Sequence, residues 1–177
     1  MPHPIATIDT SVLVSLQCAG LLGALSVQFE RVLVPTMVRN ELAAGGAKNQ
    51  GALRALAEYA FFENCDEYDP ALVSLLLGTR SSAKEGRDQG EAEAVIQAAQ
   101  FRADMVLVDD SLGREWAAKH SLHCHGTIWI CGELRRAGFL PELRKYFLLM
   151  LQGGRRQPVQ EMNKFLREFG EQDIADP

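Results

Sequence analysis

The sequence lacks the features that mark a disulfide-stabilised, zinc-ribbon or membrane-spanning protein. Its four cysteines are widely scattered and form no Cys-x-x-Cys pair, so we expect buried, reduced thiols. The first residues carry no basic segment typical of a signal peptide, and the apolar stretch 12–25 is interrupted by Gln17, Gly20 and Gly23. A second apolar run, residues 146–151, is too short to span a membrane. We therefore expect a cytoplasmic protein without membrane contact.

A glycine-rich phosphate loop is also missing. The pairs Gly45-Gly46 and Gly153-Gly154 have neither Walker nor dinucleotide-binding spacing. The net charge of −5 argues against nonspecific adhesion to nucleic acid, but residues 135–167 contain eight basic and two acidic residues and so carry +6. Such a basic stretch suits an enzyme that acts on a polyanion, and it equally suits a solvated helix face.

The length and the pattern of apolar residues predict one α/β domain. With 177 residues, 47% of them hydrophobic, the chain can bury a sizeable core. Short apolar runs alternate with helical patterns, which predicts a parallel sheet covered on both faces. The predicted strands are residues 5–8, 31–34, 61–65, 105–108 and 122–125. The predicted helices are 11–19, 35–44, 52–60, 70–77, one opening at 90, 111–120, 127–137, 141–152 and 158–169, and residues 78–89 form a polar loop.

Acidic residues stand where these strands end or where the next helix begins. In a β/α chain these places converge on one edge of the sheet, so carboxylates about 100 residues apart would share one pocket. Carboxylates bind hard divalent cations, which activate water and stabilise charge in phosphodiester hydrolysis. The acidic residues are Asp9, Glu41, Glu91, Glu93, Asp109 and Asp110.

Each acidic residue has a purely structural alternative. Asp9 could cap the helix after the first strand, although Thr10 or Ser11 could do the same. Glu41 could face solvent, and one of the pair at 91 and 93 could simply be a favourable charge in a first helical turn. Asp109 or Asp110 could cap the following helix. Arg114 is a candidate for touching substrate phosphate or for neutralising the acids.

Four motifs in this order resemble the PIN-domain nucleases. The resemblance covers residues 5–137 and is closest to a bacterial and archaeal subgroup related to the VapC toxins, with a Gly-Glu-Ala-Glu-Ala helix start and an Asp-Asp strand end. The motifs are Asp9-Thr10-Ser11, Val34-Pro35-x-x-Val38-x-x-Glu41, Gly90-Glu91-Ala92-Glu93-Ala94-Val95-Ile96 and Val108-Asp109-Asp110.

The resemblance implies a Rossmann-like sandwich with strand order 3-2-1-4-5 and Mg²⁺- or Mn²⁺-dependent cleavage of RNA. Residues 1–138 would form the PIN-like nuclease domain, and residues 139–177 a helical extension packed on it. Position by position, the resemblance implies Asp9, Glu41, Glu93 and Asp110 as catalytic metal ligands. Glu91 and Asp109 remain as additional ligands or replacements, Ser11 would orient the first aspartate, and Arg114 would support the site.

The resemblance also implies partners. RNA is the expected substrate, with an antitoxin protein as partner if the chain is a toxin, and we expect a homodimer. The run 146–151 would pack on the domain or form a dimer or antitoxin surface. The alternative is a noncatalytic PIN-like interaction module, because Glu93 stands where the family has Asp and Val108 where it has Thr.

Overall fold

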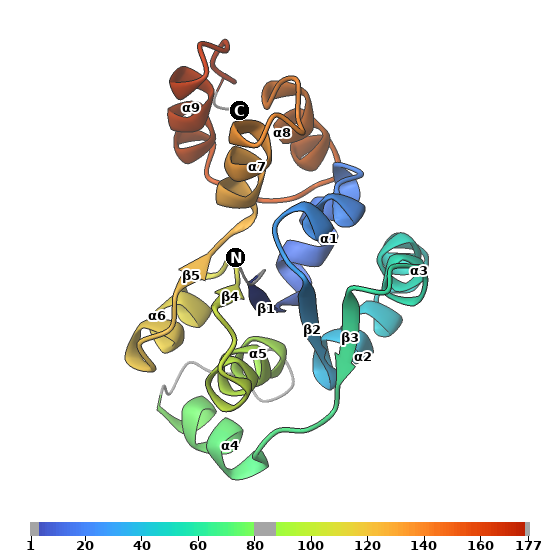
Figure 1. Ribbon diagram of the computed structural model, residues 1–177, viewed down its shortest axis with the longest axis vertical. Helices are drawn as coiled ribbons and strands as arrows, with labels where there is room; N and C mark the ends of the chain where they lie inside the picture. The colour runs from blue at the N-terminus through green and yellow to red at the C-terminus, as the bar shows by residue number, and fades with distance from the viewer. Residues whose placement is uncertain (1–3, 80–87, 176–177) are drawn as a thin grey trace.

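A five-stranded parallel sheet forms the centre of the molecule. The computed structural model describes residues 4–79 and 88–175. The strand order is β3-β2-β1-β4-β5, and all neighbouring strands run parallel (Figure 1). This confirms the α/β class and the strand order that the family resemblance implies. The strands are β1 (Ile5–Ile8), β2 (Arg31–Pro35), β3 (Phe62–Cys65), β4 (Met105–Leu107) and β5 (Cys124–His125).

Helices connect the strands and cover both faces of the sheet (Figure 1). Each predicted helix is present with slightly different ends, and two 3-10 helices, η1 (Leu22–Val27) and η2 (Gly46–Asn49), were not predicted. Most of the predicted loop 78–89 lies outside the described residues. The helices are α1 (Thr10–Cys18), α2 (Thr36–Ala44), α3 (Gln50–Glu58), α4 (Pro70–Gly78), α5 (Gln89–Phe101), α6 (Ser111–Lys119), α7 (Thr127–Arg136), α8 (Arg144–Gln152) and α9 (Val159–Glu168).

The start predicted for α8, at Pro141, is wrong by three residues. The carboxylate of Glu171 accepts hydrogen bonds from Leu143 N (2.8 and 2.9 Å) and from Arg144 N (2.8 Å). A carboxylate at this point satisfies amide groups that have no partner within the helix and complements the helix dipole. The helix therefore begins where a distant side chain caps it, which the local sequence does not reveal.

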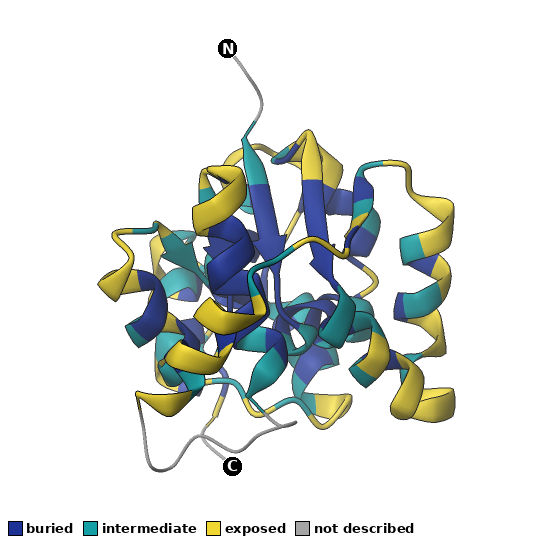
Figure 2. Cartoon of the chain, turned by 90° about the horizontal axis from the view of Figure 1, so that it is seen from below, coloured by how far each residue is buried: buried dark blue, intermediate teal, exposed yellow. Residues whose placement is uncertain are grey.

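Alternating side chains of a strand point into two hydrophobic cores, one on each face of the sheet. In β1, Ala6 and Ile8 are fully buried in the larger core, whereas Ile5 packs against the smaller one. Thr7 also faces the smaller core, and its hydroxyl donates to Ala94 O of α5 (2.9 Å). Figure 2 shows the buried strands between helices whose outer faces are exposed. This two-residue alternation is what a sheet covered on both faces requires.

The C-terminal helices share the larger core. Phe147 and Met150 of α8 and Met162 and Leu166 of α9 are fully buried in the same cluster as Ile8. The apolar run 146–151 therefore packs on the domain, the first of the two roles expected for it. The boundary between residues 138 and 139 stays a prediction. In the described ranges, no helix is long and apolar enough to cross a membrane.

Strand register brings the ends of β1 and β4 together. Ile8 pairs with Leu107, and the backbone N–H of Asp9 donates to Leu107 O at 3.0 Å. Asp9 and the pair at 109 and 110 thus leave the sheet at the same carboxyl edge. In an open parallel sheet this edge is where ligands bind.

Candidate active site

Asp9 is the N-cap of α1 and, with Glu93, one of two buried acids among the described residues. Its side chain is 3% exposed and accepts from Ser11 N (3.0 Å) and Ser11 Oγ (2.5 Å). Of the capping residues considered, Asp9 is the one that caps this helix, and Thr10 and Ser11 do not, because the Asp9 carboxylate accepts from the free amide of Ser11. Burial raises the pKa of Asp9, the Ser11 contacts oppose that rise, and repulsion from Asp109 adds to it.

Glu41 approaches Asp9 from α2. The Thr10 hydroxyl donates to Glu41 Oε2, and the carboxylate also accepts from the Gly90 backbone. A side chain at Gly90 would crowd this contact, since its Cβ would lie 3.0 Å from Glu41 Oε1. Burial raises the pKa of Glu41, and repulsion from Asp9 and Glu93 raises it further. Glycine at the start of α5 thus has a physical reason, which is the close approach of this carboxylate.

Glu91 lines a cleft with Asp109 and Asp110 and is repelled by several other carboxylates. Its Oε2 is buried and has no hydrogen-bond partner among the described residues. Burial raises its pKa from the ordinary 4.5 to about 9, and repulsion contributes in the order Asp9, Asp110, Asp88 and Glu41. The carboxylates that follow β1 and β4, that of Glu41 in α2 and that of Asp88 before α5 are therefore near enough to raise the pKa of Glu91.

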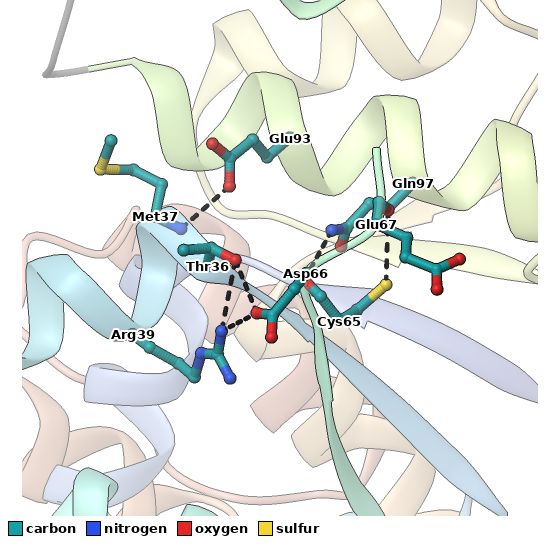
Figure 3. A network of polar contacts seen from close by, with 8 residues as sticks. All are labelled: Thr36, Met37, Arg39, Cys65, Asp66, Glu67, Glu93 and Gln97. Atoms are coloured by element: carbon teal, nitrogen blue, oxygen red, sulfur yellow. Dashed lines mark hydrogen bonds and ion pairs between the residues drawn. The ribbon is translucent and has the colours of Figure 1, made fainter. Parts of the chain in front are cut away.

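Glu93 faces a different part of the molecule. Its side chain is 1% exposed, and its oxygens accept from Met37 N (2.9 Å) and Gln89 Nε2 (3.1 Å). Figure 3 shows this contact beside the Thr36–Asp66–Arg39 cluster. Since Pro35 gives α2 no side-chain cap, Glu93 of α5 supplies a carboxylate at that helix N-terminus.

The two aspartates after β4 have separate partners. Asp110 is exposed and caps α6 by accepting from Leu112 N at 2.7 Å. Asp109 accepts from Thr127 N and Thr127 Oγ1, both at 2.7 Å, and from Gln157 Nε2, also at 2.7 Å. Asp109 is thus fixed by α7 and the segment before α9, whereas Asp110 is exposed and its carboxylate bonds to the helix that it caps.

Arg114 lies beside Asp109. A methyl group built on Gly126 would be 2.5 Å from Arg114 Nη2 and 2.6 Å from Asp109 Oδ1, so both atoms pack against that backbone. The adjoining cleft has a volume of about 350 Å³ and is lined by residues near the carboxyl edge of the sheet and by the segment between α8 and α9. Its lining residues are Ser11, Glu91, Asp109, Asp110 and the segment Gly154, Arg155, Arg156 and Gln157.

Several polar residues of the site were not predicted. Thr10 and Thr127 each begin a helix, where a hydroxyl is unremarkable, and Asp88 lies in the expected polar loop. Gln157 follows the two arginines of the extension and carries no sequence signal for a contact with Asp109. A threonine immediately after Asp9 was the one available hint.

The carboxylates fit a divalent cation in their chemistry. Oxygen donors suit Mg²⁺ and Mn²⁺, and a cation would relieve the repulsion that raises the pKa values of Asp9, Glu41 and Glu91. The buried Glu91 Oε2 lacks the partner that a cation would supply. Over residues 4–79 and 88–175, no three His, Cys, Asp or Glu side chains form a ready-made metal site. Binding therefore requires the carboxylates to turn towards one another.

Fold and site together define a PIN-like α/β protein, with a 3-2-1-4-5 parallel sheet and acids at its carboxyl edge. A family model described as DUF3368, PIN domain, matches residues 5–171, and the chain belongs to this family. The searches of curated proteins and of solved structures each found no match. PIN domains are generally nucleases that bind nucleic acid and use divalent metal ions, so the chain is of the nuclease type.

Proposed function

We propose that this protein is a Mg²⁺- or Mn²⁺-dependent ribonuclease that hydrolyses RNA phosphodiester bonds at the carboxyl edge of its sheet. The observation that carries the proposal is Glu91, a half-buried residue whose buried Oε2 has no partner among the described residues and whose carboxyl is repelled by Asp9, Asp110 and Glu41. Apolar side chains would pack at this edge of the sheet without electrostatic repulsion. Neighbouring carboxylates destabilise the fold by repulsion and desolvation unless a cation binds between them.

The acids proposed to hold the cation are Asp9, Glu41, Glu91 and Asp110. When bound, the cation activates water and stabilises charge on the phosphodiester oxygens. Ser11 fixes the Asp9 carboxylate through two hydrogen bonds, and Thr10 fixes Glu41. Asp109 lines the cleft, and its carboxylate is held in place by two hydrogen bonds from Thr127.

The family resemblance implies Glu93 as a metal ligand, and we propose Glu91 in its place. Glu93 has both oxygens engaged by Met37 N and Gln89 Nε2, whereas Glu91 has an oxygen without a partner. We therefore assign Glu93 to the stability of α2 and Glu91 to the metal.

Cleavage of a labelled single-stranded RNA in Mn²⁺ tests the function. Asp9→Asn is the sharpest variant, because asparagine still caps a helix and the fold is expected to survive. We expect cleavage by the wild type, its loss in EDTA, and a fall of about a hundredfold or more in Asp9→Asn. Glu142→Gln removes an exposed carboxylate on the extension and serves as the control. A wild type that leaves RNA intact in Mn²⁺ and Mg²⁺ overturns the proposal in favour of a noncatalytic module.

The same activity would serve a toxin restrained by an antitoxin or a stand-alone RNA-processing enzyme in the cytoplasm, and we propose the toxin. Induced expression should then arrest growth, and Asp9→Asn should relieve the arrest.

We also propose a homodimer, supported by Leu72 and Leu75 of α4, which are 40% and 68% exposed. Light scattering of wild type and Leu75→Glu tests it, and a monomeric wild type would exclude it.

A further inference from the structure

The segment between α8 and α9 runs across the candidate active site. It leaves the core at the buried Met150, passes beside α1, and re-enters at Val159 (Figure 1). Gly154 has φ +75°, and Gly153 lies so close to Cys18 that a Cβ there would be 2.6 Å from its Sγ. The glycine pair therefore ends α8 and lets the chain turn tightly against α1.

Two side chains fasten this segment to the site. Gln157 Nε2 donates to Asp109 Oδ2 at 2.7 Å and to Ser15 Oγ at 3.1 Å, and Arg155 Nε donates to the same hydroxyl at 3.2 Å. Ser15 is fully buried, and its own hydroxyl donates to Ser11 O at 2.7 Å. The segment is thus hydrogen-bonded to α1, the helix that Asp9 caps, and to the aspartate that follows β4.

Arg156, between Arg155 and Gln157, is free to bind a ligand. It is exposed, it lines the cleft with Glu91, Asp109 and Asp110, and it has no hydrogen bond or ion pair with any described residue. An arginine that lines an acidic cleft without pairing with its carboxylates can present its guanidinium to an anion from outside. Guanidinium groups bind phosphate through paired hydrogen bonds.

We propose that residues 153–158 form the substrate-binding arm of this site, in which Arg156 contacts a phosphate of the bound RNA strand. This inference rests on the proposed ribonuclease function. The carboxylates alone would repel a polyanion, so a positive charge that lines the same cleft holds the strand against the edge where the acids lie. Arg155 and Gln157 are positioning residues that hold the arm in place.

Salt-dependent binding of a labelled single-stranded RNA tests the arm. Arg156→Gln and its control Lys164→Gln are made in the Asp9→Asn background, where the RNA stays intact. Lys164 is exposed on α9 of the same extension and does not line the cleft, and its replacement removes the same charge. Loss of one phosphate contact should reduce the slope of log Kd against log salt by about 0.7. Between 0.1 M and 1 M salt, the rise in Kd should therefore be about fivefold smaller than in the background protein. Lys164→Gln should keep the slope of its background.

The outcomes separate this inference from the function on which it rests. A reduced slope in Arg156→Gln alone supports the arm. An equal slope in both variants, beside a wild type that cleaves RNA, overturns the arm and leaves the ribonuclease proposal standing. A reduced slope in Arg156→Gln with no cleavage by the wild type overturns the ribonuclease and leaves a nucleic-acid-binding arm.

Discussion

Replacing Glu91 with glutamine should change how the stability of the metal-free protein depends on pH. The pKa of this carboxyl rises from 4.5 to about 9 on folding, so between these values the folded state holds a proton that the unfolded state has lost. The free energy of unfolding therefore falls as pH rises through this window. Glu91→Gln removes that ionisation and should flatten the curve.

The size of the effect follows from the shift. A tenfold change in an ionisation constant corresponds to about 1.4 kcal/mol, so the ceiling is about 6 kcal/mol. Glu91 lies at an open cleft, where water and counter-ions screen the repulsion, and we expect about 1–3 kcal/mol. Urea unfolding in EDTA at pH 5, 7 and 9 measures it.

Glu93→Gln is the matched control, two residues along the same helix. Its glutamine oxygen can still accept from Met37 N, so we expect a loss of about 1 kcal/mol from the weaker cap. With Mn²⁺ at a hundredfold excess over Kd, wild type and Glu93→Gln should gain about 2.7 kcal/mol, and Glu91→Gln much less. A pH slope as steep in Glu91→Gln as in the wild type, or a metal response lost only in Glu93→Gln, would refute the assignment.

Two further variants test the supports of the site. Gly90→Ala should lower Mn²⁺-dependent RNA cleavage, because the new Cβ displaces the Glu41 carboxylate, while urea unfolding stays within about 1 kcal/mol since alanine favours the helix; unchanged cleavage would contradict this. Gln157→Leu removes the donor shared by Asp109 and Ser15 and should cost about 1–2 kcal/mol in urea unfolding and raise KM for RNA more than it lowers kcat. An unaltered KM would show that the arm needs no such anchor.

Local sequence patterns predicted the strands, the α-helices and the set of acids. Short apolar runs between helical patterns predicted the five strands. The acids at strand ends and helix starts predicted one edge for Asp9, Asp109 and Asp110, because parallel strands share a direction. The order of the strands came only with the family resemblance, since no local pattern specifies which strand pairs with which.

The tertiary structure decided which acids face one another. Glu91 and Glu93 are two residues apart on a helix and point about 200° apart, so only the rotation of α5 against the sheet selects one. That rotation is fixed by packing and by the Thr7–Ala94 hydrogen bond. The contact between Gln157 and Asp109 likewise spans 48 positions, and it exists because two glycines turn the chain back across α1. Local patterns carry no information about such contacts, because they depend on how whole elements pack.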